Sequence, residues 1–368
     1  MSPRASLPVT VTRTVLSLSI AAATLAPAAS AGPPKRPRVV WPVPNPTFGR
    51  ADFAPTTRLR QISGVFGPRL KWGGARYDHH EGLDFFAFFD PALPAGDHPV
   101  LSIMDGVVSE VIEPPDPERT ETGRKVVVTH PVPWSAFGAP EAWGQVQTGY
   151  LHLSRIEVQQ GQRVEAGATL GRAGETGHTS TVHLHFNAYR AGGRAVNVNP
   201  ARLFDPKRFP ADVTPIHKRT VSVEWLERDL TAGTALARVT LPHNAYTLDG
   251  FVVQVGRDTT RAASFEAVSA TQRDRRDTGD VDLFAGLRLF PLRYNGGGTI
   301  DRVNADSIPA GWPAARFPVA GGQGVRLGFD VLATDVPANA KSIKLHVLGV
   351  AGERVTVPAR SYRSIVGN

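Results

Sequence analysis

The chain has 368 residues, of which 41% are hydrophobic and 20% charged, a balance that predicts two globular domains and excludes wholesale disorder and a multi-span membrane protein. Its formal charge is +8, carried by 34 arginines and 7 lysines; no compact basic run occurs, so we expect a solvated basic surface and no nucleic-acid partner. Cysteine is absent, which excludes disulfides, cysteine nucleophiles and cysteine-ligated metals and leaves histidines and carboxylates as the ligands for any transition metal.

Residues 1–31 are typical of an export signal. Arg4 and Arg13 give a positive start, residues 15–25 are uncharged and mostly apolar, and residues 29–31 (ASA) form a small-residue cleavage site. The apolar stretch is shorter than the roughly 20 residues of a membrane-spanning helix, although an uncleaved anchor is the alternative. Cleavage lowers the net charge from +8 to +6. We therefore expect a protein that is secreted or acts in the cell envelope, with no stable membrane insertion after signal removal.

Residues 32–50 are rich in proline, which favours extended backbone and indicates a linker. From 51 to 205, short apolar segments alternate with glycine-rich turns, a pattern typical of an antiparallel sheet. Two longer interruptions, 113–123 and the aromatic-bearing 131–148, are interpreted as loops that either border a cleft or cover the end of a barrel. The expected strands of this domain lie at 63–66, 83–89, 100–103, 107–112, 125–129, 149–153, 169–171 and 182–189.

A polar stretch at 205–212 indicates a second domain boundary. Beyond it, strands are expected at 221–225, 235–241, 251–255, 287–292, 325–332 and 343–350, with the polar stretch 272–280 as a solvated loop. The predicted fold class is mainly β: an antiparallel β-sheet domain followed by a β-sandwich-like accessory domain over 212–368.

Metal-binding residue types are concentrated in three short segments. The first holds His80 and Asp84 as an H-x-x-x-D pair, the second holds His152, and the third holds His183 and His185 as an H-x-H pair. A catalytic zinc ion takes three such ligands and keeps a fourth position for water. His80, Asp84 and His185 make a His₂Asp set for one Zn²⁺ per chain. His152 and His183 are then available as catalytic residues that move protons.

Strand geometry indicates how these groups reach one cleft. Side chains alternate between the two faces of a strand, so His183 and His185 share a face. The same parity predicts that Tyr150 and His152 share a face. Tyr150 is then expected either to contact His152 or a substrate, or to pack in the core. Such a cluster suits metal-assisted hydrolysis of an amide bond.

The ordered motifs resemble the lysostaphin/LytM-type zinc metallopeptidases. The resemblance covers about residues 52–189. It consists of SGVFGPR at 63–69, HEGLD at 80–84, DGVV at 105–108, YLHL at 150–153, GQRV at 161–164, GATLG at 167–171, GETG at 174–177 and HLHF at 183–186. It implies the duplicated hybrid motif fold and assigns the metal to the first histidine and the aspartate of H-x-x-x-D and to the second histidine of H-x-H. It assigns catalytic roles to His152 and His183.

The resemblance implies an exported zinc metalloendopeptidase that hydrolyses peptide bonds of bacterial peptidoglycan, in cross-bridges or stem peptides, by a metal-activated water. Its partners are then peptidoglycan peptides, and the basic surface allows contact with anionic wall polymers. One departure is Thr181, which stands where the family usually has glycine before H-L-H and is expected to reshape the cleft wall. The C-terminal half is expected to dock on wall material, shape the cleft or stabilise the peptidase.

Two other functions are considered. The first is a non-enzymatic peptidoglycan-binding or amidase-regulating protein on the same fold, against which the intact ligand set argues. The second is another histidine-based metalloenzyme such as a cupin, whose motif normally opens with H-x-H. Among neighbouring residues, His79, Glu81 and His178 are expected to lie outside the metal site. The remaining histidines are interpreted as structural or exposed; they are His98, His130, His217, His243 and His346.

Overall fold

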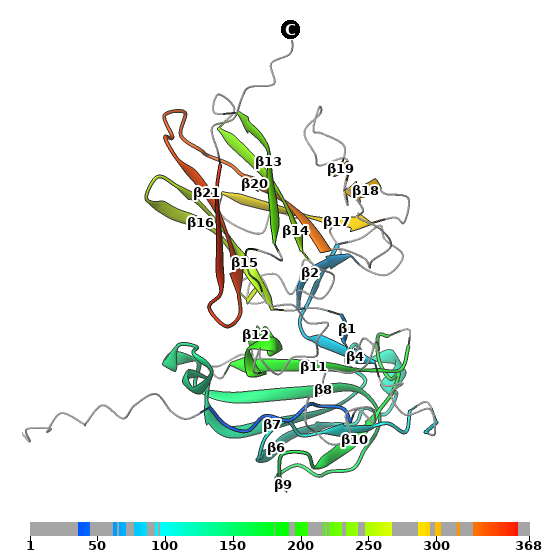
Figure 1. The fold of residues 1–368 in the computed structure, drawn as a ribbon. Helices are drawn as coiled ribbons and strands as arrows, with labels where there is room; N and C mark the ends of the chain where they lie inside the picture. The colour runs from blue at the N-terminus through cyan, green and yellow to red at the C-terminus, as the bar shows by residue number, and fades with distance from the viewer. Residues whose placement is uncertain are drawn as a thin grey trace, which may run out of the picture. The chain divides into compact units, whose positions relative to one another are not determined.

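The protein is mainly β, as predicted, and every strand pair in the described part of the computed structural model is antiparallel (Figure 1). No helix among the described residues is long and apolar enough to span a membrane. The expected export signal and the boundary at 205–212 lie outside the described residues. The structure describes residues 36–44, 62–64, 66–70, 77–86, 93–94, 96–179, 181–190, 196–204, 216, 218, 221–229, 233–241, 247–266, 286–294, 299–302, 315–316 and 327–359.

The N-terminal half is built on a ten-stranded sheet. Its main path runs β1 (Ile62–Gly64), β4 (Leu83–Phe86), β11 (His183–Arg190), β8 (Gln145–Ile156), β7 (Arg124–Pro133), β6 (Gly106–Ile112) and β9 (Arg163–Val164). Three strands join it off this path, namely β5 (Pro99–Leu101), β10 (Thr169–Ala173) and β12 (Val196–Val198). A separate two-stranded sheet pairs β2 (Gly67–Leu70) with β3 (Tyr77–His80). All eight expected strands of this domain coincide with observed ones, whereas β2, β3, β9 and β12 were not expected.

The core of this half lies on one face of the central strands. In β11, Leu184 and Phe186 are fully buried and pair with Phe85 and Leu83 of β4. Burying each such side chain contributes about 1.5–3 kcal/mol. The same face of β8 presents Tyr150, whose ring centroid lies 5.3 Å from that of Phe186. The opposite face of β4 and β11 is therefore left for polar side chains.

The described residues of the proline-rich segment, 36–44, have no helix or strand and pack against the sheet domain. Trp41 is 5% exposed and packs edge-on against Phe85, with 5.0 Å between ring centroids. The backbone N–H of Val40 donates to the carbonyl of Ile103 over 2.9 Å. Apolar residues between the prolines have thus joined the core of the sheet domain, which composition alone did not indicate.

The predicted aromatic loop at 131–148 is shorter in the structure, because β7 continues to Pro133 and β8 begins at Gln145. Two 3-10 turns, η3 (Trp134–Phe137) and η4 (Glu141–Trp143), occupy the interval. Trp134 is fully buried, and its indole N–H donates to the carbonyl of Tyr189 over 2.9 Å. The Trp134 ring also packs against Phe137 and Trp143, with centroid distances of 6.1 and 5.7 Å. Two further 3-10 turns are η2 (Pro117–Arg119) and η5 (Pro200–Leu203).

The described residues of the C-terminal half form two sheets. The six-stranded sheet runs β13 (Ser222–Asp229), β14 (Thr234–Leu241), β20 (Leu327–Ala333), β17 (Leu287–Tyr294), β18 (Thr299–Arg302) and β19 (Ala315–Arg316). The four-stranded sheet runs β16 (Asp258–Ser264), β15 (Leu248–Val255), β21 (Ile343–Gly349) and β22 (Arg354–Pro358). Phe251 of β15 contacts Phe329 of β20 with ring centroids 5.4 Å apart, so apolar faces of the two sheets meet, as expected of a sandwich-like domain. The predicted polar loop at 272–280 lies outside the described residues.

Candidate metal centre

The register between β4 and β11 places an aspartate beside the H-x-H pair. His185 lies opposite Asp84, and Leu184 and Phe186 lie opposite the core residues Phe85 and Leu83. Because residues paired across strands point to the same face, His183, His185 and Asp84 share the face that the core does not use.

His80 reaches the same point from the end of β3. Its Nε2 atom lies 3.0 Å from Asp84 Oδ1 and 3.0 Å from His185 Nδ1. His185 Nδ1 lies 2.9 Å from the same carboxylate oxygen. All three residues are largely buried, with side-chain exposures of 6%, 11% and 13%. Three potential ligand atoms from two segments about 100 residues apart thus converge on one point.

The donor set fits a zinc ion. Zinc accepts imidazole nitrogen and carboxylate oxygen at about 2.0–2.2 Å, and tetrahedral coordination then separates the ligand atoms by roughly 3.4 Å. The observed separations of 2.9–3.0 Å are close to this value. A buried carboxylate surrounded by imidazoles also supplies the negative charge that a divalent cation requires. His80, Asp84 and His185 are therefore the residues that could hold the metal.

Asp84 is held in its charged form. Burial acts to raise the pKa of this carboxyl, but the charge of His80 and hydrogen bonds from His183, His185 and His80 outweigh it, so the pKa lies well below its usual value. The carboxylate is consequently a ready ligand at neutral pH without prior loss of a proton.

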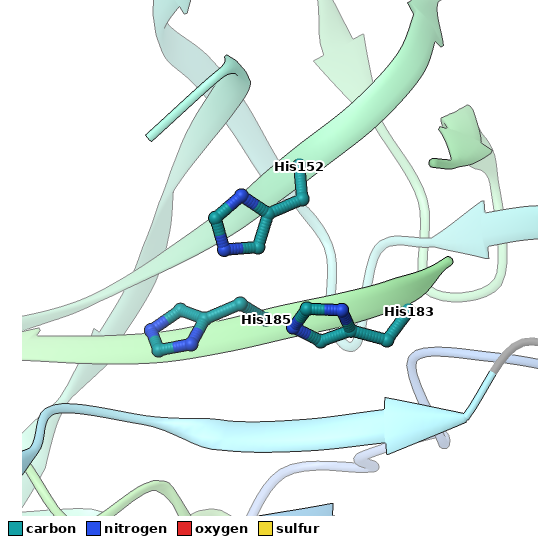
Figure 2. A group of neighbouring side chains, drawn as sticks. All are labelled: His152, His183 and His185. Atoms are coloured by element: carbon teal, nitrogen blue, oxygen red, sulfur yellow. The ribbon is translucent and has the colours of Figure 1, made fainter. Parts of the chain in front are cut away.

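His152 reaches the cleft by a route that strand parity did not predict. In the β8–β11 register, Leu151 lies opposite His185 and Tyr150 lies opposite Phe186, which puts Tyr150 on the core face. His152 has φ +62°, a left-handed conformation that is uncommon for residues other than glycine. This backbone conformation directs the His152 ring toward His183 and His185 (Figure 2). The centroid of the His152 ring lies 5.0 Å from that of His183 and 5.7 Å from that of His185. The expectation that Tyr150 and His152 share a face is therefore wrong.

Tyr150 takes part in a buried polar chain instead. Its hydroxyl accepts a hydrogen bond from the backbone N–H of Ile103 over 3.0 Å, and the Thr148 hydroxyl lies within hydrogen-bond distance of both Tyr150 and His130. Burial raises the pKa of Tyr150 to about 12 and lowers the pKa of His130 to about 4. Both groups are neutral at pH 7, and they serve the core.

Backbone carbonyls orient the two remaining imidazoles. The Nδ1–H of His152 donates to the carbonyl of Thr176 over 2.8 Å, and the Nδ1–H of His183 donates to the carbonyl of Thr181 over 2.8 Å. A carbonyl only accepts, so His152 in its neutral form carries its hydrogen on Nδ1 and presents an Nε2 lone pair. His183 also carries a hydrogen on Nδ1, and its Nε2 lies 3.5 Å from Asp84 Oδ1. Burial, with the neighbouring charges of His185 and His183, lowers the pKa of His152 to about 3, which favours this neutral form. Thr181, the residue that departs from the family pattern, supplies its hydrogen bond through the backbone.

The five predicted site residues are thus brought together. They form two groups that could hold a metal, His80–Asp84–His185 and His152–His183–His185, and within each group the ligand atoms lie within 4.8 Å of one another. His79, Glu81 and His178 are in neither group: His79 is buried edge-on against Phe66 at 5.7 Å, Glu81 is half-buried and His178 is exposed.

The remaining histidines lie away from these groups or outside the described residues. His98, His130 and His346 are buried elsewhere, and His217 and His243 lie outside the described residues. Thr176 is the residue that sequence reasoning missed. The segment GETG at 174–177 was part of the resemblance, but nothing in it indicated which atom would face His152.

Gly82 allows the turn between β3 and β4 to lie directly against β11. A Cβ atom at this position would lie 2.5 Å from the carbonyl oxygen of Phe186, 2.4 Å from Asn187 Oδ1 and 2.8 Å from His185 Nε2. Backbone oxygen cannot move aside as a flexible side chain can. No side chain larger than hydrogen fits at Gly82 unless the turn between β3 and β4 moves away from β11, and His80 would move away from His185 with it.

We expect the substitution Gly82→Ala to weaken zinc binding as well as folding. The clash should cost about 1–3 kcal/mol of unfolding free energy and displace His80 from its partners. Denaturant unfolding and metal content after dialysis measure the two effects. Gly161→Ala is the matched control, because Gly161 has φ +85° but no heavy atom within 4 Å of a Cβ. It should lower stability without loss of zinc, and equal zinc content in both variants would contradict the role given to Gly82.

Comparison with known proteins supports the resemblance seen in the motifs. Residues 78–200 match Peptidase family M23. The chain is 34% identical over 144 residues to the peptidoglycan DD-endopeptidase ShyA of Vibrio cholerae, covering 39% of this chain and 28% of the relative. It is 30% identical over 119 residues to the glycyl-glycine endopeptidase ALE-1 of Staphylococcus capitis, covering 31% and 25%. The predicted resemblance to lysostaphin/LytM-type peptidases is confirmed, and the aligned region spans only about a quarter of the length of these relatives.

Solved structures match a similar share of this chain. The catalytic domain of lysostaphin from Staphylococcus simulans is 26% identical, with a TM-score of 0.27, and the match covers 38% of this chain and 87% of that chain. A zinc-containing peptidase from Vibrio cholerae is 32% identical, with a TM-score of 0.28, covering 40% and 38%.

Proposed function

We propose that residues 51–205 form a zinc metalloendopeptidase domain that hydrolyses peptide bonds of bacterial peptidoglycan, in cross-bridges or stem peptides. One observation carries the proposal: three ligand atoms of His80, Asp84 and His185 lie within 3.0 Å of one another, beside the imidazoles of His152 and His183. The match to Peptidase family M23 supports the reaction class. The names of the relatives, peptidoglycan and glycyl-glycine endopeptidases, support the substrate class.

The proposal includes one zinc ion per chain and export to the wall. A zinc ion held by the His₂Asp set would act as a Lewis acid on the scissile carbonyl and on the attacking water. Such a substrate lies outside the cytoplasm, which agrees with the export signal predicted at residues 1–31. Residues 212–368, which carry no catalytic motif, are proposed to be an accessory domain that docks on wall material or supports the peptidase.

The chain's own side chains perform the proton transfers. His152 Nε2, which the hydrogen bond from Nδ1–H to the Thr176 carbonyl leaves as the acceptor atom of the ring, is placed to take the proton of the attacking water as a general base. His183 lies next to it, with ring centroids 5.0 Å apart, and shares proton transfer and stabilisation of the developing oxyanion. Because Asp84 and these rings are largely buried, their interactions with developing charge are stronger than they would be in water.

Digestion of defined muropeptides tests the function. The full chain should release fragments from a cross-linked muropeptide, and a chelator should abolish the release, with added zinc restoring it. A directly cross-linked dimer and a glycine-bridged dimer, each analysed by mass spectrometry, distinguish the bond that is cut. A zinc-loaded protein that binds both dimers and cleaves neither would support the non-enzymatic alternative. Cleavage that persists after removal of metal would contradict the metal-dependent mechanism.

A further inference from the structure

We propose that Thr176 is a positioning residue for His152, and that its side-chain hydroxyl holds the carbonyl group that fixes the tautomer and direction of this imidazole. The inference rests on the proposed function for its catalytic consequence, but its structural part can be measured independently of activity. It adds to the site a residue that is in neither candidate metal group.

The hydroxyl of Thr176 connects two strands beside the site. It accepts a hydrogen bond from the backbone N–H of Arg124 in β7 over 3.0 Å and donates to the carbonyl of Leu153 in β8 over 2.8 Å. Arg124 and Leu153 are partners in the β7–β8 ladder, at a point where the register shifts. The threonine is 5% exposed, so its hydroxyl satisfies two backbone groups at this irregularity that water reaches poorly.

The carbonyl of the same residue accepts the Nδ1–H of His152 over 2.8 Å. On its other side, the segment 121–123 packs without a gap: a Cβ at Gly123 would lie 2.2 Å from the Thr176 carbonyl oxygen, and a Cβ at Gly177 would lie 2.4 Å from the nitrogen of Gly123. Two glycines with positive φ are therefore required for this close approach. The carbonyl is thus held by the hydroxyl on one side and by a backbone segment on the other.

His152 needs such support because of its backbone conformation. A non-glycine residue at φ +62° is in an unfavourable region, and persists only where surrounding contacts hold it. Its own N–H donates to the carbonyl of Thr122 over 3.1 Å, and its ring donates to Thr176. Loss of the Thr176 hydroxyl leaves the Arg124 N–H and the Leu153 carbonyl without their partner, so the 174–177 segment must move to satisfy them. The ring of His152 then loses the acceptor that keeps its hydrogen on Nδ1.

The experiment compares Thr176→Val, Thr176→Ser and Thr148→Val in the full chain. Valine keeps the shape and removes the hydroxyl, whereas serine restores it. Thr148 of β8 is the matched control, because its buried hydroxyl also makes two contacts that belong to the core, with His130 of β7 and Tyr150 of β8. Three readouts are taken: bound zinc, kcat and KM on a cross-linked muropeptide, and the nitrogen-15 spectrum of labelled histidines, in which the His152 signals are identified by their loss in His152→Gln.

We expect Thr176→Val to retain one zinc ion, to lose kcat by roughly 10- to 100-fold through misplacement of the base, and to leave KM within about 2-fold of its original value. Its His152 spectrum should change from the Nδ1–H tautomer to a mixture, in the zinc-free and the zinc-loaded protein alike. Thr176→Ser should recover both properties, and Thr148→Val should keep both despite reduced stability. An unchanged His152 spectrum in Thr176→Val, or an equal loss of kcat in Thr148→Val, would overturn the inference. If the unsubstituted chain cleaves no muropeptide, the proposed function fails, while the spectra still decide the role of Thr176.

Discussion

Replacing His185 with alanine is expected to abolish both zinc binding and peptide hydrolysis. Its Nδ1 atom lies 3.0 Å from His80 Nε2 and 2.9 Å from Asp84 Oδ1, so its removal leaves two protein ligands where zinc requires three. Loss of a residue that only supports a ligand already lowers metal affinity by about 10- to 100-fold, and loss of a ligand itself should exceed this. Metal analysis after dialysis and muropeptide release measure the two effects.

His178→Ala is the control for this prediction. His178 lies in the turn that precedes β11, is exposed and is in neither candidate metal group. Its substitution should preserve zinc content and hydrolysis. Full digestion of purified wall by His185→Ala protein would refute the ligand assignment and, with it, the proposed metal site.

Replacing His152 with alanine should separate the two effects: the protein should retain zinc but lose most of its turnover. The three proposed ligands are untouched, but the neutral imidazole that faces them is lost. General base catalysis typically contributes a factor of about 10²–10⁴, so kcat should fall within this range with zinc remaining near one per chain. Parallel measurement of metal content and kcat distinguishes a catalytic role from a ligand role, and loss of zinc together with activity would show that His152 binds the metal.

Tyr150→Phe is the matched control on the same strand. The Tyr150 hydroxyl accepts the Ile103 N–H in the core, on the face opposite His185. Removing this buried hydrogen bond should lower the unfolding free energy by about 1 kcal/mol and leave kcat unchanged. A large fall in kcat would mean that Tyr150 serves the site after all, and that the interpretation of its face needs revision.

Local sequence patterns were sufficient to predict how several of the site's side chains are oriented. The alternation of β11 correctly placed His183 and His185 on one face with Leu184 on the other, because a regular strand has a period of two residues. The H-x-x-x-D spacing correctly indicated that His80 and Asp84 lie close together, and the structure adds that the turn at Gly82 between them leaves no room for a side chain. Both features depend on neighbours a few residues apart.

The predicted direction of the His152 side chain was wrong, because contacts with residues far away in the sequence outweighed the alternation of side chains along the strand. Period-two alternation put His152 beside Tyr150, but hydrogen bonds to Thr122 and Thr176 hold His152 at φ +62° and reverse its direction. Proline content predicted a linker at 32–50, and the structure adds that Trp41 of this segment packs against Phe85 in the core. In each case the energy that decided the outcome comes from residues far away in the chain, which a local pattern does not contain.

The available chemistry can be recognised in the amino-acid order alone: no cysteine, an ordered set of histidines and one aspartate, strands with a period of two residues, and motifs that resemble a peptidase family. The folded sheet is what brings His80 and His185, 105 residues apart, to one carboxylate and sets the carbonyls of Thr176 and Thr181 against the neighbouring rings. The physical reason is that strand register and the packing of turns against strands are set by hydrogen bonds and close contacts between distant segments. Those interactions exist only once the whole sheet has formed.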